Sequence, residues 1–251
     1  MKLKVDVVLT PAELAALTPA RLKIATCVVF DVLRATSTMV TALHSGAREV
    51  VVVGSIEEAL TYPKSSPGVI LAGERGGQRI LAAQTGSIDF DLGNSPREFT
   101  PERVHGQTIV MTTTNGTKAI QECHGASTIL AGSFLNMGAV ATALQKVLPE
   151  ELLLVCAGTG SGAAYEDLLA AGALLRTLDD TVFDKHSDAC AIATHLHKCA
   201  GDDLRSVLAS TLNGRRLAGS PNLKGDVDYC AQVNLISDVV TIEGNVARRR
   251  P

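Results

Sequence analysis

The segment Val28–Leu43 constrains the fold most, because it joins a strand pattern directly to a helix pattern. Its apolar beginning is too short for anything but a buried strand, and helical spacing of apolar residues starts at Met39. The polar side chains at the junction are those of Asp31, Arg34, Thr36, Ser37 and Thr38. Free N–H groups at a helix start attract anions, and hydroxyl or guanidinium groups nearby strengthen that attraction. The junction therefore predicts an anion site at a strand-to-helix turn.

The same design recurs further along the chain. Buried strands are predicted at Thr108–Met111, Thr128–Ala131 and Leu152–Val155, and each runs through a polar segment into a helix. Alternating strands and helices of this length predict an α/β protein with a mainly parallel sheet and helices on both faces. We expect a single α/β catalytic unit over residues 1–251, or two lobes without a sharp boundary. The polar junctions are expected to meet at one rim of the sheet.

The last third of the chain has a different pattern. From about Asp179 the spacing becomes helical, with helices predicted at Ser187–Ala200 and Asp202–Ser210. The Gly-, Asn- and Pro-rich stretch Asn213–Gly225 is typical of turns. The basic run Arg248–Arg250 is interpreted as a frayed terminus.

Composition excludes several classes of function. A net charge of -3 and a low aromatic content of 3% argue against a nucleic-acid partner. The first residues lack the apolar core of a signal peptide, and no segment reaches membrane-spanning length, so we expect a cytoplasmic protein without a membrane partner. The six cysteines form no Cys-x-x-Cys pair, which favours reduced thiols over zinc ligands or disulfides.

Asp31 has three interpretations: a metal ligand, a nucleophile on phosphorus, or a helix cap. A nucleophilic aspartate of the haloacid-dehalogenase type would want a second aspartate two residues later, where this chain has Leu33. Cys27 and Arg34 are one residue too far apart for the Cys-x5-Arg loop of cysteine phosphatases. Because a carboxylate repels an anion unless a cation lies between them, we interpret the junction as binding a metal ion together with a phosphorylated substrate.

Further carboxylates for such a metal follow the strand at Leu152–Val155. Glu166 and Asp167 fall in the first turn of a predicted helix, where acids also balance the helix dipole without any further role. Magnesium prefers hard oxygen ligands and keeps several waters. Adjacent residues on a helix point about 100° apart, so we expect only one of the two to face the site.

Three glycine-containing segments are candidates for ligand binding. Gly73–Gly77, predicted as a flexible loop after a short strand at Val69–Ala72, carries opposite charges. Thr112–Lys118 has the hydroxyls, glycine and lysine of a phosphate cradle but no Walker pattern, so a nucleoside triphosphatase is not expected. Gly158–Ala163 fits Gly-x-Gly-x-x-Ala between a strand and a helix, as in a dinucleotide fingerprint.

Several segments together resemble the magnesium-dependent 2-phosphosulfolactate phosphatase (ComB) family. The matching segments are Asp31–Thr38, Gly73–Gly77, Phe90–Pro96, Thr112–Thr117 and Cys156–Gly158 with Glu166–Asp167. The resemblance implies a three-layer α/β/α sandwich with a mainly parallel or mixed sheet. It also implies hydrolysis of the phosphate monoester of a 2-hydroxy acid, with 2-phosphosulfolactate and water giving 3-sulfolactate and phosphate on a route to coenzyme M.

Site roles follow from this resemblance and from the charges on the loops. The metal, Mg²⁺, is expected at Asp31 and Glu166, with Glu74 and Asp167 behind them, and Asp31, Arg34 and Glu166 are expected to be catalytic. Positive charge and hydroxyls from separate loops suit a small phosphorylated acid. The expected substrate-binding residues are Thr36, Ser37, Arg75, Thr112, Thr113, Thr114, Asn115 and Lys118.

Alternatives remain open at this point. Gly158–Ala163 would support a nicotinamide-dinucleotide-dependent oxidoreductase, and the same pockets would suit a non-catalytic binder of phosphorylated acids. Attack on phosphorus by water, with magnesium neutralising the developing charge, competes with a phosphoaspartate formed at Asp31. The physiological substrate and the oligomeric state are also open, and a homo-oligomer is compatible with the sequence.

Overall fold

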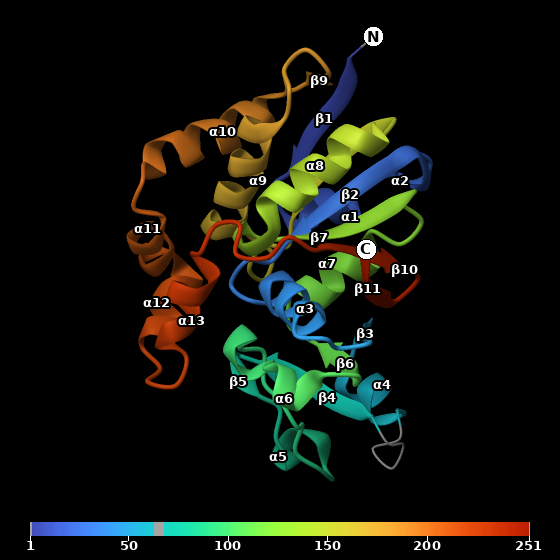
Figure 1. Ribbon diagram of the computed structural model, residues 1–251, viewed down its shortest axis with the longest axis vertical. Coiled ribbons are helices and arrows are strands. Elements are labelled where there is room, and N and C mark those ends of the chain that lie inside the picture. Colours follow the sequence, from blue (N-terminus) through green and yellow to red (C-terminus); the bar gives the residue numbers. More distant parts are fainter. Residues whose placement is uncertain (1, 63–67, 251) are drawn as a thin grey trace.

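The computed structural model describes residues 2–62 and 68–250. In these ranges eleven strands form one mixed sheet in the order β5-β4-β6-β3-β11-β10-β7-β2-β8-β1-β9 (Figure 1). The strands are β1 Leu3–Val8, β2 Ala25–Phe30, β3 Glu49–Val52, β4 Val69–Arg75, β5 Gln78–Arg79, β6 Thr108–Thr112, β7 Thr128–Gly132, β8 Glu151–Cys156, β9 Phe183–Asp184, β10 Val239–Glu243 and β11 Val246–Arg250.

Helices flank this sheet on both sides, which confirms the predicted α/β class. The α-helices are α1 Pro11–Ala15, α2 Pro19–Ile24, α3 Ala35–His44, α4 Ile56–Leu60, α5 Ala82–Thr85, α6 Pro101–Val104, α7 Gly116–Glu122, α8 Met137–Val147, α9 Tyr165–Thr177, α10 Asp188–Ala200, α11 Leu204–Ser210, α12 Leu212–Ala218 and α13 Lys224–Cys230, with 3-10 turns η1 Pro96–Glu98 and η2 Phe134–Asn136. No helix in the described ranges is long and apolar enough to cross a membrane.

Two groups of parallel strands make up most of the sheet. One runs β7-β2-β8-β1-β9 and the other β3-β6-β4, with the short β5 antiparallel at its edge. The hairpin β10–β11 joins the groups, because β10 pairs antiparallel with β7 and β11 pairs antiparallel with β3. Val240 is paired with Ala131, and Val246 with Val51.

This hairpin overturns the interpretation of Arg248–Arg250 as a frayed terminus. The three arginines belong to β11, where Thr241 is paired with Arg248, and the Arg248 guanidinium donates to Glu49 Oε2 at 2.6 Å. The edges of two parallel groups leave unpaired backbone N–H and C=O groups. Because β10 and β11 supply partners for both edges, the basic segment is held in the middle of the sheet in spite of its charge.

The helix α3 packs on one face of the sheet where the two groups of strands are joined, over β7, β10, β11 and β3 (Figure 1). Its Met39 and Leu43 share one buried apolar core with Val29 of β2 and Val50 of β3. The opposite face of the strands β7-β2-β8-β1-β9 packs against α8 and α9, in a second core that includes Leu169. A third, smaller core lies under α4 on the outer face of β3, β4 and β6. The apolar spacing of α3 therefore seats its polar first turn between the two halves of the sheet.

The C-terminal helices differ from the prediction in one stretch. The segment expected to form turns at Asn213–Gly225 contains α12 and the first residues of α13. Thr211 caps α12 by accepting from the Gly214 amide at 3.0 Å. A Cβ on Gly214 would lie 1.8 Å from the Leu208 carbonyl oxygen, so glycine is needed there for close packing and not for a turn.

Two smaller expectations have clear outcomes. The segment expected to be a flexible loop from Gly73 is partly strand, since β4 runs to Arg75 and a tight turn at Gly76 and Gly77, with φ of 61° and 82°, leads into β5. All six cysteines are free, and five of them are buried, as the sequence predicts for reduced thiols.

Candidate active site

The carboxyl end of β2 places Asp31 at the start of a tightly bonded turn into α3. The Thr36 hydroxyl accepts from the Asp31 amide and donates to the Asp31 carbonyl, each at 3.0 Å. The Ser37 hydroxyl holds the next residue of the turn, because it donates to the Val32 carbonyl at 2.9 Å. The hydroxyls of Thr36 and Ser37, expected to bind substrate, therefore hold the turn that orients Asp31.

The carboxyl of Asp31 is only weakly used as a helix cap. Its Oδ1 accepts from the Ala35 amide at 3.4 Å, and its Oδ2 has no hydrogen bond to any described residue. A Cβ on Gly116 would lie 2.6 Å from Oδ2, so the turn between β6 and α7 passes directly over this carboxylate. The strands β2 and β6 are not neighbours in the sheet, but α7, which follows β6, packs against β2 and α3 and so brings Gly116 to Asp31.

Four carboxyl groups, which we call the acid cluster, gather here: Asp31, Glu74, Glu166 and Asp167. The pKa of Asp31 is raised to about 7, chiefly by burial and also by the charges of Glu74 and Glu166, which together outweigh the lowering by the Ala35 amide and Arg34. Burial also raises the pKa of Asp167, with added repulsion from Asp31 and Glu166. The cluster is thus a place where negative charge is concentrated and incompletely balanced.

Two members of the acid cluster use both oxygens to hold loops. Glu74 accepts from the amides of Thr114 and Gly77, each at 2.7 Å. Asp167 accepts from the amides of Val32, at 3.0 Å, and Gly158, at 3.1 Å. These carboxylates fasten the loops around the cluster, and their oxygens are less available to a ligand.

The other two members of the acid cluster, Asp31 and Glu166, each keep one carboxylate oxygen without a hydrogen bond to a described residue. Glu166 is buried on α9, and its Oε1 accepts from Asn213 Nδ2 at 2.5 Å while Oε2 has no partner among the described residues. Glu166 therefore resembles Asp31, whose Oδ2 likewise has no hydrogen bond to a described residue. Both neighbouring acids of α9 are buried, but they differ in use: Asp167 is bonded to backbone and Glu166 keeps an oxygen for a ligand.

This donor set fits magnesium in one particular way. Among the described side chains, no group of three or more His, Cys, Asp or Glu residues is arranged to hold a metal ion by itself. Magnesium is usually bound by one or two carboxylates together with waters and substrate phosphate oxygens. Asp31 and Glu166, each with a free oxygen in a region of uncompensated negative charge, meet that requirement.

The segment after β6 supplies polar groups next to the acid cluster. The Thr112 hydroxyl accepts from Arg75 Nη2 at 3.0 Å, and Thr113 is bonded to Thr117 through backbone and hydroxyl groups. Asn115 Oδ1 accepts from the Gly160 amide at 3.2 Å, which joins this segment to the loop after β8. The side chains of Thr114 and Lys118 are exposed and remain available to a substrate, whereas the Thr112 and Thr113 hydroxyls lie buried within the protein.

Arg34, which is expected to be catalytic, is held in place by contacts within the protein. Its guanidinium is buried and donates to Asp226 Oδ2 at 2.9 Å and to the Gly77 carbonyl at 2.8 Å. Asp226, fully buried on α13, also accepts from the Ser95 hydroxyl at 2.6 Å. Two donors of Arg34 are therefore committed inside the protein, and its other N–H groups remain for a ligand.

Two residues of this site were missed by reasoning from the sequence. Asn213 begins the stretch interpreted as turns and Asp226 directly follows its last residue, and neither belongs to a recognisable pattern. Asn213 Nδ2 donates to Thr159 Oγ1 at 2.7 Å as well as to Glu166. Only the fold brings α12 and α13 to the rim, so no local signal could have revealed them.

The glycine loop Gly158–Ala163 is occupied by contacts within the protein. Its Gly158 amide donates to Asp167 and its Gly160 amide to Asn115, so two N–H groups that a pyrophosphate would need are already used. The next strand, β9, pairs with β1 and not with β8. The loop serves the acid cluster, and these contacts do not favour the dinucleotide interpretation.

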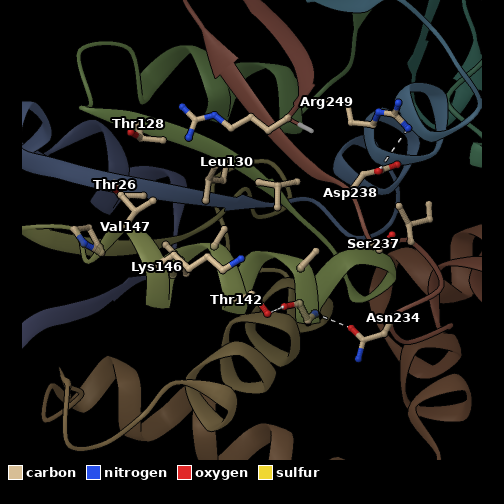
Figure 2. Close-up of a pocket in the computed structure, with 18 residues that line it drawn as sticks. Thr26, Thr128, Leu130, Thr142, Lys146, Val147, Asn234, Ser237, Asp238 and Arg249 are labelled. Carbon is tan, nitrogen blue, oxygen red and sulfur yellow. Dashed lines mark hydrogen bonds and ion pairs between the residues drawn. The ribbon is translucent and has the colours of Figure 1, made fainter.

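A separate groove of about 810 Å³ lies away from this chemistry (Figure 2). Its walls include Thr26 and Thr128, near the amino ends of β2 and β7, with Lys146 and Val147 of α8 opposite. Asp31 follows the carboxyl end of β2. The groove therefore lies at the other end of these strands, and none of the expected site residues lines it.

An α/β fold that gathers buried carboxylates with arginines at the carboxyl ends of its strands defines a class of enzymes that act on small anions. The sequence model of the 2-phosphosulpholactate phosphatase family matches residues 12–245, and the chain belongs to this family of phosphoric monoester hydrolases. The resemblance drawn from the sequence is thereby confirmed.

Individual relatives are similar over almost the whole chain. A probable 2-phosphosulfolactate phosphatase of Thermotoga petrophila is 38% identical over 242 residues, which is 96% of each chain. Proteins of the same name from Thermotoga maritima and Synechococcus sp. (strain JA-3-3Ab) are 37% and 38% identical, covering 96% of both chains in the first case and 86% of this chain and 87% of the relative in the second. The family match at residues 12–245 spans all of the site segments described above.

Proposed function

We propose that this protein is a magnesium-dependent phosphatase that hydrolyses 2-phosphosulfolactate to 3-sulfolactate and phosphate, the step on a route to coenzyme M that the family resemblance implies. The observation that carries the proposal is the acid cluster, in which Asp31 and Glu166 keep free oxygens while burial and mutual repulsion raise the pKa of Asp31 to about 7. Such a cluster calls for a cation, and the names of the relatives supply the class of anionic substrate.

The residues around the cluster have distinct parts in this reaction. A magnesium ion held by Asp31 and Glu166 would neutralise the charge that develops on the transferred phosphoryl group. Arg75, fixed by its bond to Thr112, and the exposed Lys118 offer positive charge to the phosphate oxygens. Glu74 and Asp167 keep the surrounding loops in place through their backbone contacts.

The bond changes are those of an in-line displacement on phosphorus. A water oxygen bonds to phosphorus as the bond to the C2 oxygen breaks, and the two water protons end on the phosphate and on the new hydroxyl. An acid-cluster carboxylate orients the water. Attack by Asp31 itself would instead form a phosphoaspartate, which acid quenching of a reaction with ³²P-labelled substrate would trap on the protein.

Phosphate release tests the proposal. Wild-type protein is incubated with 2-phosphosulfolactate or 2-phospholactate, each with magnesium and with excess chelator. We expect release of phosphate that the chelator abolishes and that magnesium restores. Absence of release from both substrates by folded protein would contradict the proposed activity, and release that is unchanged in chelator would contradict the role of the metal.

A further inference from the structure

A second cavity has Arg34 in its wall. It measures about 450 Å³, within the usual range for small-molecule sites, and it is lined by the β4–β5 hairpin, by η1 with the segment before it, and by the segment before α13. Gly77 connects the two places: its amide donates to Glu74, and its carbonyl accepts from Arg34, which itself lines the cavity. The cavity therefore adjoins the acid cluster through a single turn.

Positive charge prevails in this cavity. Three arginines line it, Arg34, Arg79 and Arg97, against one acid, Glu98. Asp226 lies behind Arg34 and balances one of these charges, so one net positive charge remains. Arg97 reaches Asp226 Oδ1 and the Asn222 carbonyl only at 3.5 Å, both through Nη1, and has a side chain that is 47% exposed, so its other N–H groups are available to an anion. Arg79 is exposed and has no ion pair with any described residue.

A buried polar group in the wall also lacks a partner. Asn94 is only 5% exposed and lines the cavity, yet its Oδ1 has no hydrogen-bond partner among the described residues. Unpaired buried amides are rare because they cost free energy, and rotation about χ2 would turn the N–H₂ end of this amide toward an anion. Its neighbour Ser95 is bonded to Asp226. The wall thus contains a buried amide with unused hydrogen-bonding capacity.

We propose that this cavity is the subsite for the second strong acid of the substrate, the sulfonate group, and that Arg97 and Arg79 are specificity-determining residues. The proposal rests on the proposed function, because it divides one small substrate between two adjacent places. The phosphate lies at the acid cluster, the sulfonate lies among the arginines, and Arg34 stands between them. A planar guanidinium suits such oxygen-rich anions, and a singly charged sulfonate matches the single net positive charge of the cavity.

Selectivity between two substrates tests this assignment. Values of kcat/KM for 2-phosphosulfolactate and for 2-phospholactate, which lacks the sulfonate, are measured for wild type, Arg97→Ala and Arg79→Ala. We expect the ratio of the two values to fall about tenfold in Arg97→Ala, with a smaller fall in Arg79→Ala, because only the sulfonate substrate loses a contact. Arg103→Ala is the matched control, since Arg103 is an exposed arginine outside the cavity that donates to the Asp91 carbonyl.

Binding separates failure of the subsite from failure of the activity. The affinities of 3-sulfolactate and of lactate are measured by calorimetry for the same four proteins, which requires no turnover. Tighter binding of 3-sulfolactate that weakens about tenfold in Arg97→Ala supports the subsite even if no phosphate is released. An unchanged selectivity ratio, equal losses for both substrates, or 3-sulfolactate binding that is absent or insensitive to both variants overturns it.

Discussion

Two carboxylates of this protein, the fully buried Asp226 and the partly buried Asp31, have opposite surroundings. Asp226 is fully buried, and it receives a guanidinium from Arg34, a hydroxyl from Ser95 and a more distant guanidinium from Arg97. Asp31 has one long hydrogen bond from a backbone amide and lies near three further carboxylates, those of Glu74, Glu166 and Asp167. A buried charge that the protein compensates by itself is part of the fold, whereas one left uncompensated calls for a cation from outside. The contrast distinguishes the scaffold from the reactive centre.

The largest effect is expected on the stability of the fold, when Asp226 is removed from its ion pair with Arg34. Asp226→Ala leaves the buried Arg34 guanidinium without its partner, so we expect a loss of about 3–5 kcal/mol in the free energy of unfolding, measured by urea denaturation. The double variant Arg34→Ala, Asp226→Ala should lose less than the sum of the single losses, because no lone charge remains. Strict additivity would mean that the pair is not coupled and would remove the basis of the comparison.

Substitution of Asp31, the carboxylate that the protein leaves uncompensated, is expected to lower the enzymatic activity. Asp31→Asn removes a free carboxylate oxygen, and we expect kcat to fall about a hundredfold or more, whether Asp31 holds the metal or attacks phosphorus. Phosphate release at saturating substrate measures this. Asp202→Asn, an exposed aspartate on the surface, should retain wild-type activity. If Asp31→Asn kept most of its activity, both roles would be wrong for this residue.

The same variant should gain stability when metal is removed. The pKa of Asp31 is raised to about 7 in the folded state, so between its ordinary value and 7 the folded protein holds more protons than the unfolded chain. Stability is therefore lost as the pH rises through this window. In chelator at pH 8, Asp31→Asn should melt above wild type, by roughly 2–4 °C for each kcal/mol relieved, and the gap should shrink toward pH 5. An equal difference in melting temperature between Asp31→Asn and wild type at both pH values would contradict the raised pKa of Asp31.

The smallest effect is expected at Lys118. Its side chain is exposed on α7, so solvent screens its attraction for a phosphate. We expect Lys118→Ala to raise KM about two- to fivefold with little change in kcat. Lys23→Ala, an exposed lysine on α2, serves as the control. A loss of kcat as large as that of Asp31→Asn would move Lys118 into the reactive centre.

Much of this arrangement could be predicted from local patterns, and the rest depends on long-range packing. Strand-to-helix junctions reveal Asp31 and the Thr112–Lys118 segment because turn chemistry and apolar spacing are local signals. Asp226 has no such signal, since its role depends on a contact with a residue 192 positions away. The same holds for β11. Its arginines have the local pattern of a frayed terminus, and only the pairing of β11 with β10 and β3 makes them part of the sheet.

The central claim is that Asp31 and Glu166 together hold a divalent cation. Calorimetric titration of magnesium, with inorganic phosphate present, into wild type, Asp31→Asn, Glu166→Gln and Asp202→Asn tests it most directly. The account predicts binding to wild type and Asp202→Asn and a large loss of affinity in the other two variants. Equal affinity in all four proteins, or no binding to wild type, would contradict it.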